Sequence, residues 1–177
     1  SLDPLREPLT SVDTVSEAAI RGILWPADPV TRFMPPGLER RHAFAQLIET
    51  ISAADLGTEL EAAAKLQGLA HRAGFEVKRW RTGDEDFLVL VETAAQRRGA
   101  GAYLFRLAPG LGPASSPKGA AILQAPHVFH DEGTGTLALR LFLSQELPPT
   151  QRPWALFVNN AHRYLDERGR TKKHKHN

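Results

Sequence analysis

The spacing of apolar residues predicts a long helix near the middle of the chain. Between residues 53 and 73, leucines and alanines recur at every third or fourth position, which places them on one face of a helix. Ser52 and Asp55 have the spacing of a capping box, and Gly74 is the kind of residue that often ends a helix. We therefore expect a helix over Ala53 to Ala73, with His71 on its surface.

Short apolar runs of the length and composition of β-strands follow this helix. They cover residues 75–80, 87–92, 102–108, 120–125 and 155–159. Thr82, Gly83 and Asp84 form a turn signal, so the first two runs are expected to form a hairpin. A helix followed at once by a glycine and an apolar strand is common in α/β layers. The pattern predicts a single layered α/β domain with a mainly parallel or mixed central sheet flanked by helices.

The two ends of the chain differ from this central part. Residues 1–38 contain six prolines, which interrupt helices and sheet ladders, so we expect an extended N-terminal arm. Only Val12 to Leu24 can hold a helix there, with Ser16 or Thr14 as its N-cap. Residues 168–177 have no apolar side chain and are expected to form a disordered basic tail. The α/β domain is therefore expected to cover residues 39–167.

Composition narrows the classes of function. With 177 residues and 42% hydrophobic content, the chain can build one ordinary core. The net charge of +2 comes largely from the tail, so no nucleic-acid partner is expected. No apolar run reaches the roughly 18 residues of a membrane span. The start at Ser1 suggests a processed terminus, and export is compatible with the absence of cysteine.

Candidate metal ligands follow two of the predicted strands. His127, His130, Asp131 and Glu132 come after the strand at 120–125, and Asn159, Asn160 and His162 come at the end of the last strand. If these strands are parallel neighbours, both polar segments open at the same edge of the sheet, where ligands bind in α/β proteins. Because the chain has no cysteine, a metal here would need His, Asp or Glu. Two imidazoles and one carboxylate are a common zinc arrangement in hydrolases.

The same residues also allow readings without catalysis. Acidic residues before a helix stabilise its N-terminus, which is an alternative role for Asp131 and Glu132. Which of His127 and His130 points into the crevice depends on the loop between them. The rival hypothesis is a non-catalytic binding or interaction module, in which these His and acidic residues form a structural cluster.

The segment Ala125 to Ala138 resembles the metal-binding segment of the zinc-dependent poly-γ-glutamate hydrolase and related carboxypeptidase-like amidohydrolases. In that family a strand ends in His, an acidic ligand follows four or five residues later, and Gly-Thr leads into a helix. The second His ligand ends a later strand, which matches the segment up to His162, so the resemblance extends from Ala120 to Tyr164. It implies zinc bound by His127, Asp131 and His162, with Glu132 as the alternative carboxylate.

The resemblance implies hydrolysis of a small peptide or amide substrate. Chemistry alone suggests Arg163 or Arg106 as the residue that holds a substrate carboxylate. The catalytic carboxylate is not assigned. The only acidic residues after His162 are Asp166 and Glu167, and Glu92, at the end of an earlier strand, belongs to no motif. The chain has no Gly-x-Ser-x-Gly, P-loop or Gly-x-Gly-x-x-Gly motif, so serine-hydrolase and nucleotide-binding classes lack their defining residues.

Overall fold

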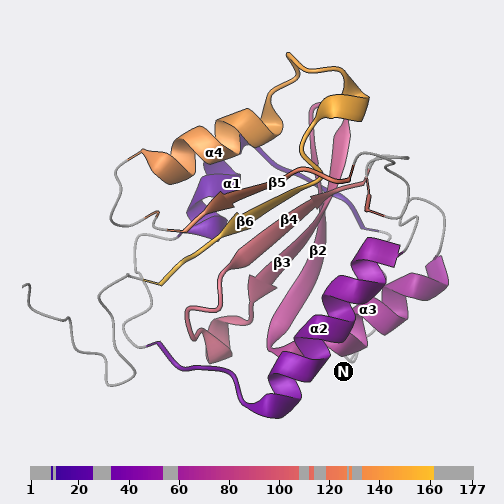
Figure 1. The fold of residues 1–177 in the computed structure, drawn as a ribbon, viewed down its shortest axis with the longest axis vertical. Helices are drawn as coiled ribbons and strands as arrows, with labels where there is room; N and C mark the ends of the chain where they lie inside the picture. The colour runs from indigo at the N-terminus through magenta and orange to yellow at the C-terminus, as the bar shows by residue number, and fades with distance from the viewer. Residues whose placement is uncertain are drawn as a thin grey trace, which may run out of the picture.

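The computed structural model contains a mixed sheet between two layers of helices (Figure 1). It describes residues 9, 11–25, 33–53, 60–107, 112–113, 119–126, 128 and 133–161. The helices are α1 (Glu17–Leu24), α2 (Leu38–Ala53), α3 (Leu60–Ala73) and α4 (Thr134–Leu143), with short 3-10 turns η2 (Ala94–Gln96) and η3 (Pro149–Gln151). The strands are β1 (Asp13–Thr14), β2 (Phe75–Thr82), β3 (Glu85–Glu92), β4 (Ala102–Arg106), β5 (Ile122–Ala125) and β6 (Ala155–Val158). This arrangement confirms the predicted α/β fold class.

The sheet has the strand order β1-β2-β3-β4-β6-β5. Its two outer pairs, β1 with β2 and β5 with β6, are parallel, and the inner pairs are antiparallel. The predicted hairpin is present, because β2 and β3 pair along their whole length around Gly83, which has a φ of +57°. The sheet is therefore mixed, as expected, with antiparallel strands at its centre.

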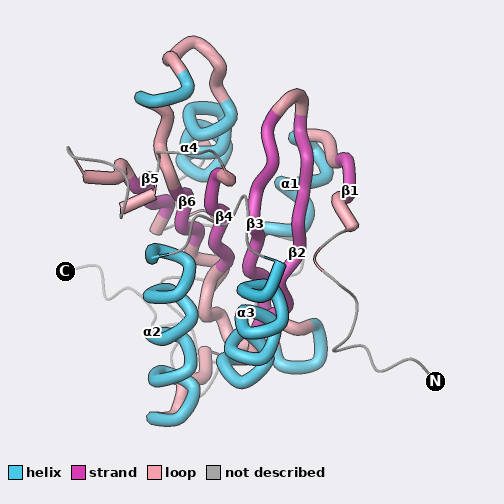
Figure 2. The backbone as a smooth tube through the Cα atoms, turned by 90° about the vertical axis from the view of Figure 1, so that its right-hand side faces the viewer, coloured by secondary structure: helices cyan, strands magenta, loops and turns pink. Residues whose placement is uncertain are grey.

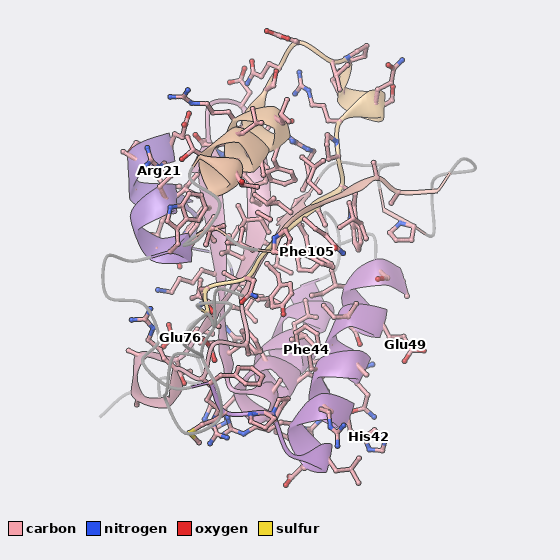
Figure 3. The ribbon with its side chains drawn as sticks, turned by 60° about the vertical axis from the view of Figure 1, so that its left-hand side comes forward. Arg21, His42, Phe44, Glu49, Glu76 and Phe105 are labelled. Atoms are coloured by element: carbon pink, nitrogen blue, oxygen red, sulfur yellow. The ribbon has the colours of Figure 1, made fainter. Side chains whose placement is uncertain are left out.

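Helices α2 and α3 pack side by side on one face of the sheet (Figure 2). Leu47, Ile51 and Leu66 of these helices are buried against sheet residues that include Leu90 and Phe105. Figure 3 shows Phe44 of α2 directed toward the sheet, while His42 and Glu49 point outward from the same helix. Burial of each large apolar side chain contributes about 1.5–3 kcal/mol, so this face holds much of the fold's stability.

Helices α1 and α4 cover the opposite face. Ile20 and Leu24 from α1 and Leu139 and Phe142 from α4 are fully buried in a second cluster of core residues. The sheet contributes residues of the opposite pleat, among them Trp80, Phe87, Val89, Leu104 and Leu156. Successive strand residues thus alternate between the two cores, as the period of two requires.

Two helix predictions in the N-terminal half had different outcomes. The helix expected between Val12 and Leu24 is α1, and the Ser16 hydroxyl accepts a hydrogen bond from Ala19 N at 3.2 Å, which confirms the N-cap. The predicted start at Ala53 of the long helix is wrong, because Ala53 is the last residue of α2. Leu60–Ala73 is helical as expected, and it ends at Gly74 with a φ of +89°. Residues 54–59 lie outside the described part.

The expected N-terminal arm is partly integrated into the domain. β1 lies at the edge of the sheet beside Trp80 and Arg81 of β2, and α1 contributes to the core. Val15 N also donates a hydrogen bond to Arg81 O at 2.9 Å. β1 and α1 are therefore part of the α/β unit, although they lie within the residues predicted to form a separate arm.

Within the described ranges, no helix combines the length and apolar character needed to cross a membrane.

Candidate functional site

The carboxyl ends of β5 and β6 lie side by side at one edge of the sheet. The two strands are in parallel register from Ile122 opposite Ala155 to Ala125 opposite Val158. Asn159 N donates a hydrogen bond to Ala125 O at 3.0 Å, which continues the pairing one step further. The neighbour relation that the sequence argument required between these strands is therefore present.

The residues predicted to bind metal lie outside the described part of the chain. These are His127, His130, Asp131, Glu132 and His162, and the predicted substrate residue Arg163 is also outside it. Among the residues that the structure does describe, no three His, Asp or Glu side chains are grouped so as to hold a metal ion. The zinc site therefore stays a prediction.

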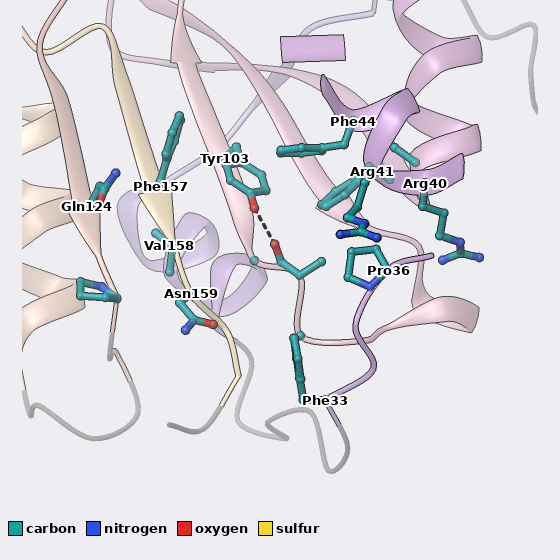
Figure 4. Close-up of a pocket in the computed structure, with 16 residues that line it drawn as sticks. Phe33, Pro36, Arg40, Arg41, Phe44, Tyr103, Gln124, Phe157, Val158 and Asn159 are labelled. Atoms are coloured by element: carbon teal, nitrogen blue, oxygen red, sulfur yellow. Dashed lines mark hydrogen bonds between the residues drawn. The ribbon is translucent and has the colours of Figure 1, made fainter. Parts of the chain in front are cut away.

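A cavity of about 540 Å³ opens at the carboxyl edge of β5 and β6 (Figure 4). It lies on the α2 side of the sheet, between the first turns of that helix and the exposed face of the edge strands. Pro126 and Asn159, which directly follow β5 and β6, belong to its lining. The described lining comes from five parts of the chain: Phe33, Pro36, Arg40, Arg41, Phe44, Ala73, Phe75, Gly99, Ala100, Gly101, Tyr103, Gln124, Pro126, Phe157, Val158 and Asn159.

Aromatic rings form the inner wall of this cavity. Tyr103 packs against Phe44, Phe75 and Phe157, with ring centroids 5.2, 5.7 and 5.1 Å away. The Tyr103 hydroxyl donates a hydrogen bond to Ala100 O at 2.6 Å. Burial, together with the nearby charge of Glu92, raises the pKa of Tyr103 to about 12. Tyr103 is therefore a neutral, internally paired part of an apolar wall.

The loop of residues 98–101 forms one side of the cavity and is held by two side chains. The Glu92 carboxylate accepts hydrogen bonds from Arg98 N at 2.7 Å and Gly99 N at 3.1 Å. Buried Asn160 accepts one from Gly101 N at 3.0 Å through its Oδ1 atom. Both Glu92 oxygens are thus bound to the backbone, which gives this carboxylate a structural role and argues against it as a general base.

A glycine is required at position 101, directly before β4. Its φ of +93° is unfavourable for other residues, and a Cβ atom there would lie 2.8 Å from Val158 O. The close approach of these two backbones brings the 98–101 loop against the end of β6. The wall of the cavity therefore depends on a glycine at this position.

Two arginines of α2 lie at the mouth of the cavity. Figure 4 shows the Arg41 guanidinium next to Pro36, whereas the Arg40 side chain extends away from the aromatic wall. Arg41 is exposed, while Arg40 is half-buried. A guanidinium at this mouth can form paired hydrogen bonds with a carboxylate or phosphate.

Arg106 lies at the other end of the sheet, where it is part of the core. It is 2% exposed, and its guanidinium forms an ion pair with Glu85 and donates hydrogen bonds to Phe142 O and Pro153 O. Its Cζ atom also lies 4.8 Å from the ring centroid of Phe142. Burial lowers the pKa of Arg106, and the Glu85 carboxylate partly opposes this shift. We assign Arg106 a structural role and leave it out of the candidate site.

The sequence argument found the edge of the sheet but missed most of the cavity. Phe44 and Arg41 belong to α2, which was not predicted, and Phe33 belongs to the proline-rich arm. The alternation of residues along the strands could have identified the aromatic lining. Phe75, Tyr103 and Phe157 all lie on the sheet face opposite the second core. The chain matches no protein-family model, no curated protein and no solved structure.

Proposed function

We propose that this protein is a zinc-dependent hydrolase of amide or peptide bonds, with its active site at the carboxyl edge of β5 and β6. In this proposal His127, Asp131 and His162 hold the metal. His130 and Glu132 are the alternative ligands. The substrate is a small peptide or amide that enters the adjoining cavity.

The parallel register of β5 and β6 is the observation that carries this proposal. Neighbouring strands lie about 4.8 Å apart, so their carboxyl ends start from almost the same place. His127 follows Ala125 by two positions and His162 follows Val158 by four, and each residue spans at most about 3.6 Å. The chain lengths therefore allow both imidazoles to reach a common point beside Pro126 and Asn159. The donor set of two imidazoles and a carboxylate suits zinc.

Bound zinc would polarise the scissile carbonyl and supply activated water at neutral pH. The protein must then provide a carboxylate that takes a proton from the attacking water and passes it to the leaving amine. The described lining of the cavity contains no Asp or Glu. Asp131 and Glu132 are the acidic residues nearest in sequence to the end of β5, so we assign this role to whichever of the two does not bind zinc.

Separate substitutions of the two acids test this assignment. With Asp131 as ligand, Asp131→Asn lowers zinc content, whereas Glu132→Gln keeps the metal and lowers kcat by about 10²–10⁴-fold. Zinc content and the hydrolysis of a panel of acyl-amino acids and dipeptides are measured for each variant. Asp84→Asn in the exposed hairpin turn is the control and should change neither. Full activity in both acid variants would contradict the proposal.

The lack of a carboxylate in the described lining favours one alternative, a non-catalytic binding module with a structural metal or His/Asp cluster. Chelation separates the two functions. A structural site loses folding stability when the metal is removed, whereas a catalytic site loses activity with little change in Tm.

A further inference from the structure

We infer that the cavity beside β5 and β6 binds a large apolar side chain of the substrate, preferably an aromatic one, while Arg41 binds the substrate's free carboxylate. The identification of this ligand as a substrate rests on the proposed hydrolase function. The binding itself needs only the described residues. The inference favours peptides or acyl-amino acids with a hydrophobic residue next to the scissile bond over chains of glutamate.

The inner wall of the cavity is aromatic, and the charged side chains of its described lining are the two arginines at the mouth. Phe44, Phe75, Tyr103 and Phe157 line it with rings in mutual contact. Two polar atoms of this wall are already paired, since Tyr103 Oη donates to Ala100 O and Asn159 Oδ1 accepts from Ala161 N. An acidic side chain placed here would lose its water without gaining a partner from these atoms. An aromatic side chain would instead gain ring contacts.

The dimensions of the cavity also fit this ligand class. A volume of about 540 Å³ accommodates an amino-acid side chain together with part of its backbone, and it falls within the usual range for small-molecule sites. Pro126 and Asn159 line one end of the cavity and precede His127 and His162 by one and three positions in the sequence. Arg41 lies at the mouth of the cavity, across from β5 and β6 in Figure 4. A substrate that spans the cavity can therefore present its amide bond at one end and its carboxylate at the other.

Binding to metal-free protein tests the inference independently of catalysis. The full chain is treated with a chelator and titrated calorimetrically with N-acetyl-L-phenylalanine, N-acetyl-L-alanine and N-acetyl-L-glutamate. Burial of the benzyl group predicts about tenfold or tighter binding of the phenylalanine derivative. Equal affinity for the three ligands, or no binding of any, would overturn the inference. If the protein shows this binding preference but, without chelator treatment, neither binds zinc nor hydrolyses amides, the hydrolase proposal is overturned and the binding inference stands.

A matched pair of tryptophan variants locates the binding. Gln124 and Ile122 are both exposed and lie on the same face of β5, but only Gln124 lines the cavity. Gln124→Trp should fill the space and weaken binding of N-acetyl-L-phenylalanine about tenfold, while Ile122→Trp stays within about twofold of wild type. Equal effects of the two variants would show that the ligand binds elsewhere.

A second pair tests the role of Arg41. Wild-type protein should bind N-acetyl-L-phenylalanine more tightly than its uncharged carboxamide, because only the acid can pair with the guanidinium. Arg41→Gln should remove this difference. Arg21→Gln, at an exposed position of α1 on the other face of the sheet, should preserve it. Persistence of the difference in Arg41→Gln would overturn the assignment of Arg41.

Discussion

Tyr103 illustrates how the environment of one residue links the cavity to stability. Its pKa of about 12 in the folded protein lies above the value of 10.0 for an ordinary tyrosine, chiefly because the ring is buried. Between these values the folded protein keeps a proton that the unfolded chain has released. The contribution of this group to stability is therefore complete below pH 10 and is lost as the pH rises through 12.

We predict that Tyr103→Phe removes this pH dependence. Relative to the variant, the wild-type free energy of unfolding should fall by on the order of 2 kcal/mol between pH 10 and pH 12. Denaturant titrations at a series of pH values measure the difference, which cancels the titration of lysines common to both proteins. Tyr164→Phe is the control. Parallel stability curves for wild type and Tyr103→Phe would contradict the predicted pKa.

Glu85, at the opposite end of the sheet, also contributes to stability through its surroundings. It pairs with the guanidiniums of buried Arg106 and half-buried Arg152. Glu85→Ala leaves both charges without this partner and should lower the free energy of unfolding by about 3–5 kcal/mol. Glu76→Ala breaks an exposed pair with Lys78 and should cost no more than about 1 kcal/mol. Chemical denaturation measures both, and similar losses in the two variants would refute the difference that we attribute to burial.

Single residues also mark a boundary of what the sequence can predict. Local chemistry limited the N-cap of α1 to Ser16 or Thr14, of which Ser16 is the cap, and identified Gly74 as a helix stop. These predictions were possible because the groups involved lie within a few positions. The role of Arg106 depends on Glu85, Phe142 and Pro153, up to 47 positions away. Only the folded sheet brings these groups together, so the sequence suggested a substrate contact where the structure has a core ion pair.

At the scale of elements, hydrophobic patterning predicted the five strands β2 to β6. The metal hypothesis assumed that β5 and β6 are parallel neighbours, and the structure shows this pairing. Patterning missed α2, although Ala43, Leu47 and Ile51 are buried and the partly buried Phe44 and Ile48 widen the same apolar face. The periodicity of this helix is weak, because the apolar residues Leu38 and Ala45 are exposed on its outer side. Since α2 supplies Phe44 and Arg41, the cavity could not be inferred from the sequence.

The junction of β4 with β6 provides a test at the same scale. Gly101→Ala forces a positive φ on alanine and places its Cβ against Val158 O, so it should destabilise the protein by more than about 1–2 kcal/mol. Gly68→Ala in α3, where an added Cβ meets nothing within 4 Å, should be neutral or stabilise it by up to about 1 kcal/mol. Thermal or chemical unfolding compares the two. Equal tolerance of both alanines would show that the β4–β6 approach is not tight.

At the scale of the whole molecule, the arrangement of layers explains why a cavity forms at this edge. α4 covers β5 and β6 from one side, while α2 and α3 are placed over β2 and the centre of the sheet on the other. The cavity occupies the space between α2 and the edge strands, next to the paired carboxyl ends. Strand order thus brings segments from distant parts of the chain to one location.

The measurement that tests the central claim most directly is the zinc content of the purified protein by elemental analysis. The full chain is used with His174 and His176 replaced by Ala, so that the tail contributes no imidazole. We predict about one zinc per chain, lost in His127→Ala and in His162→Ala. His71→Ala, on the exposed end of α3, should retain it. No zinc after incubation with the metal, or wild-type zinc in both His127→Ala and His162→Ala, would contradict the proposed site.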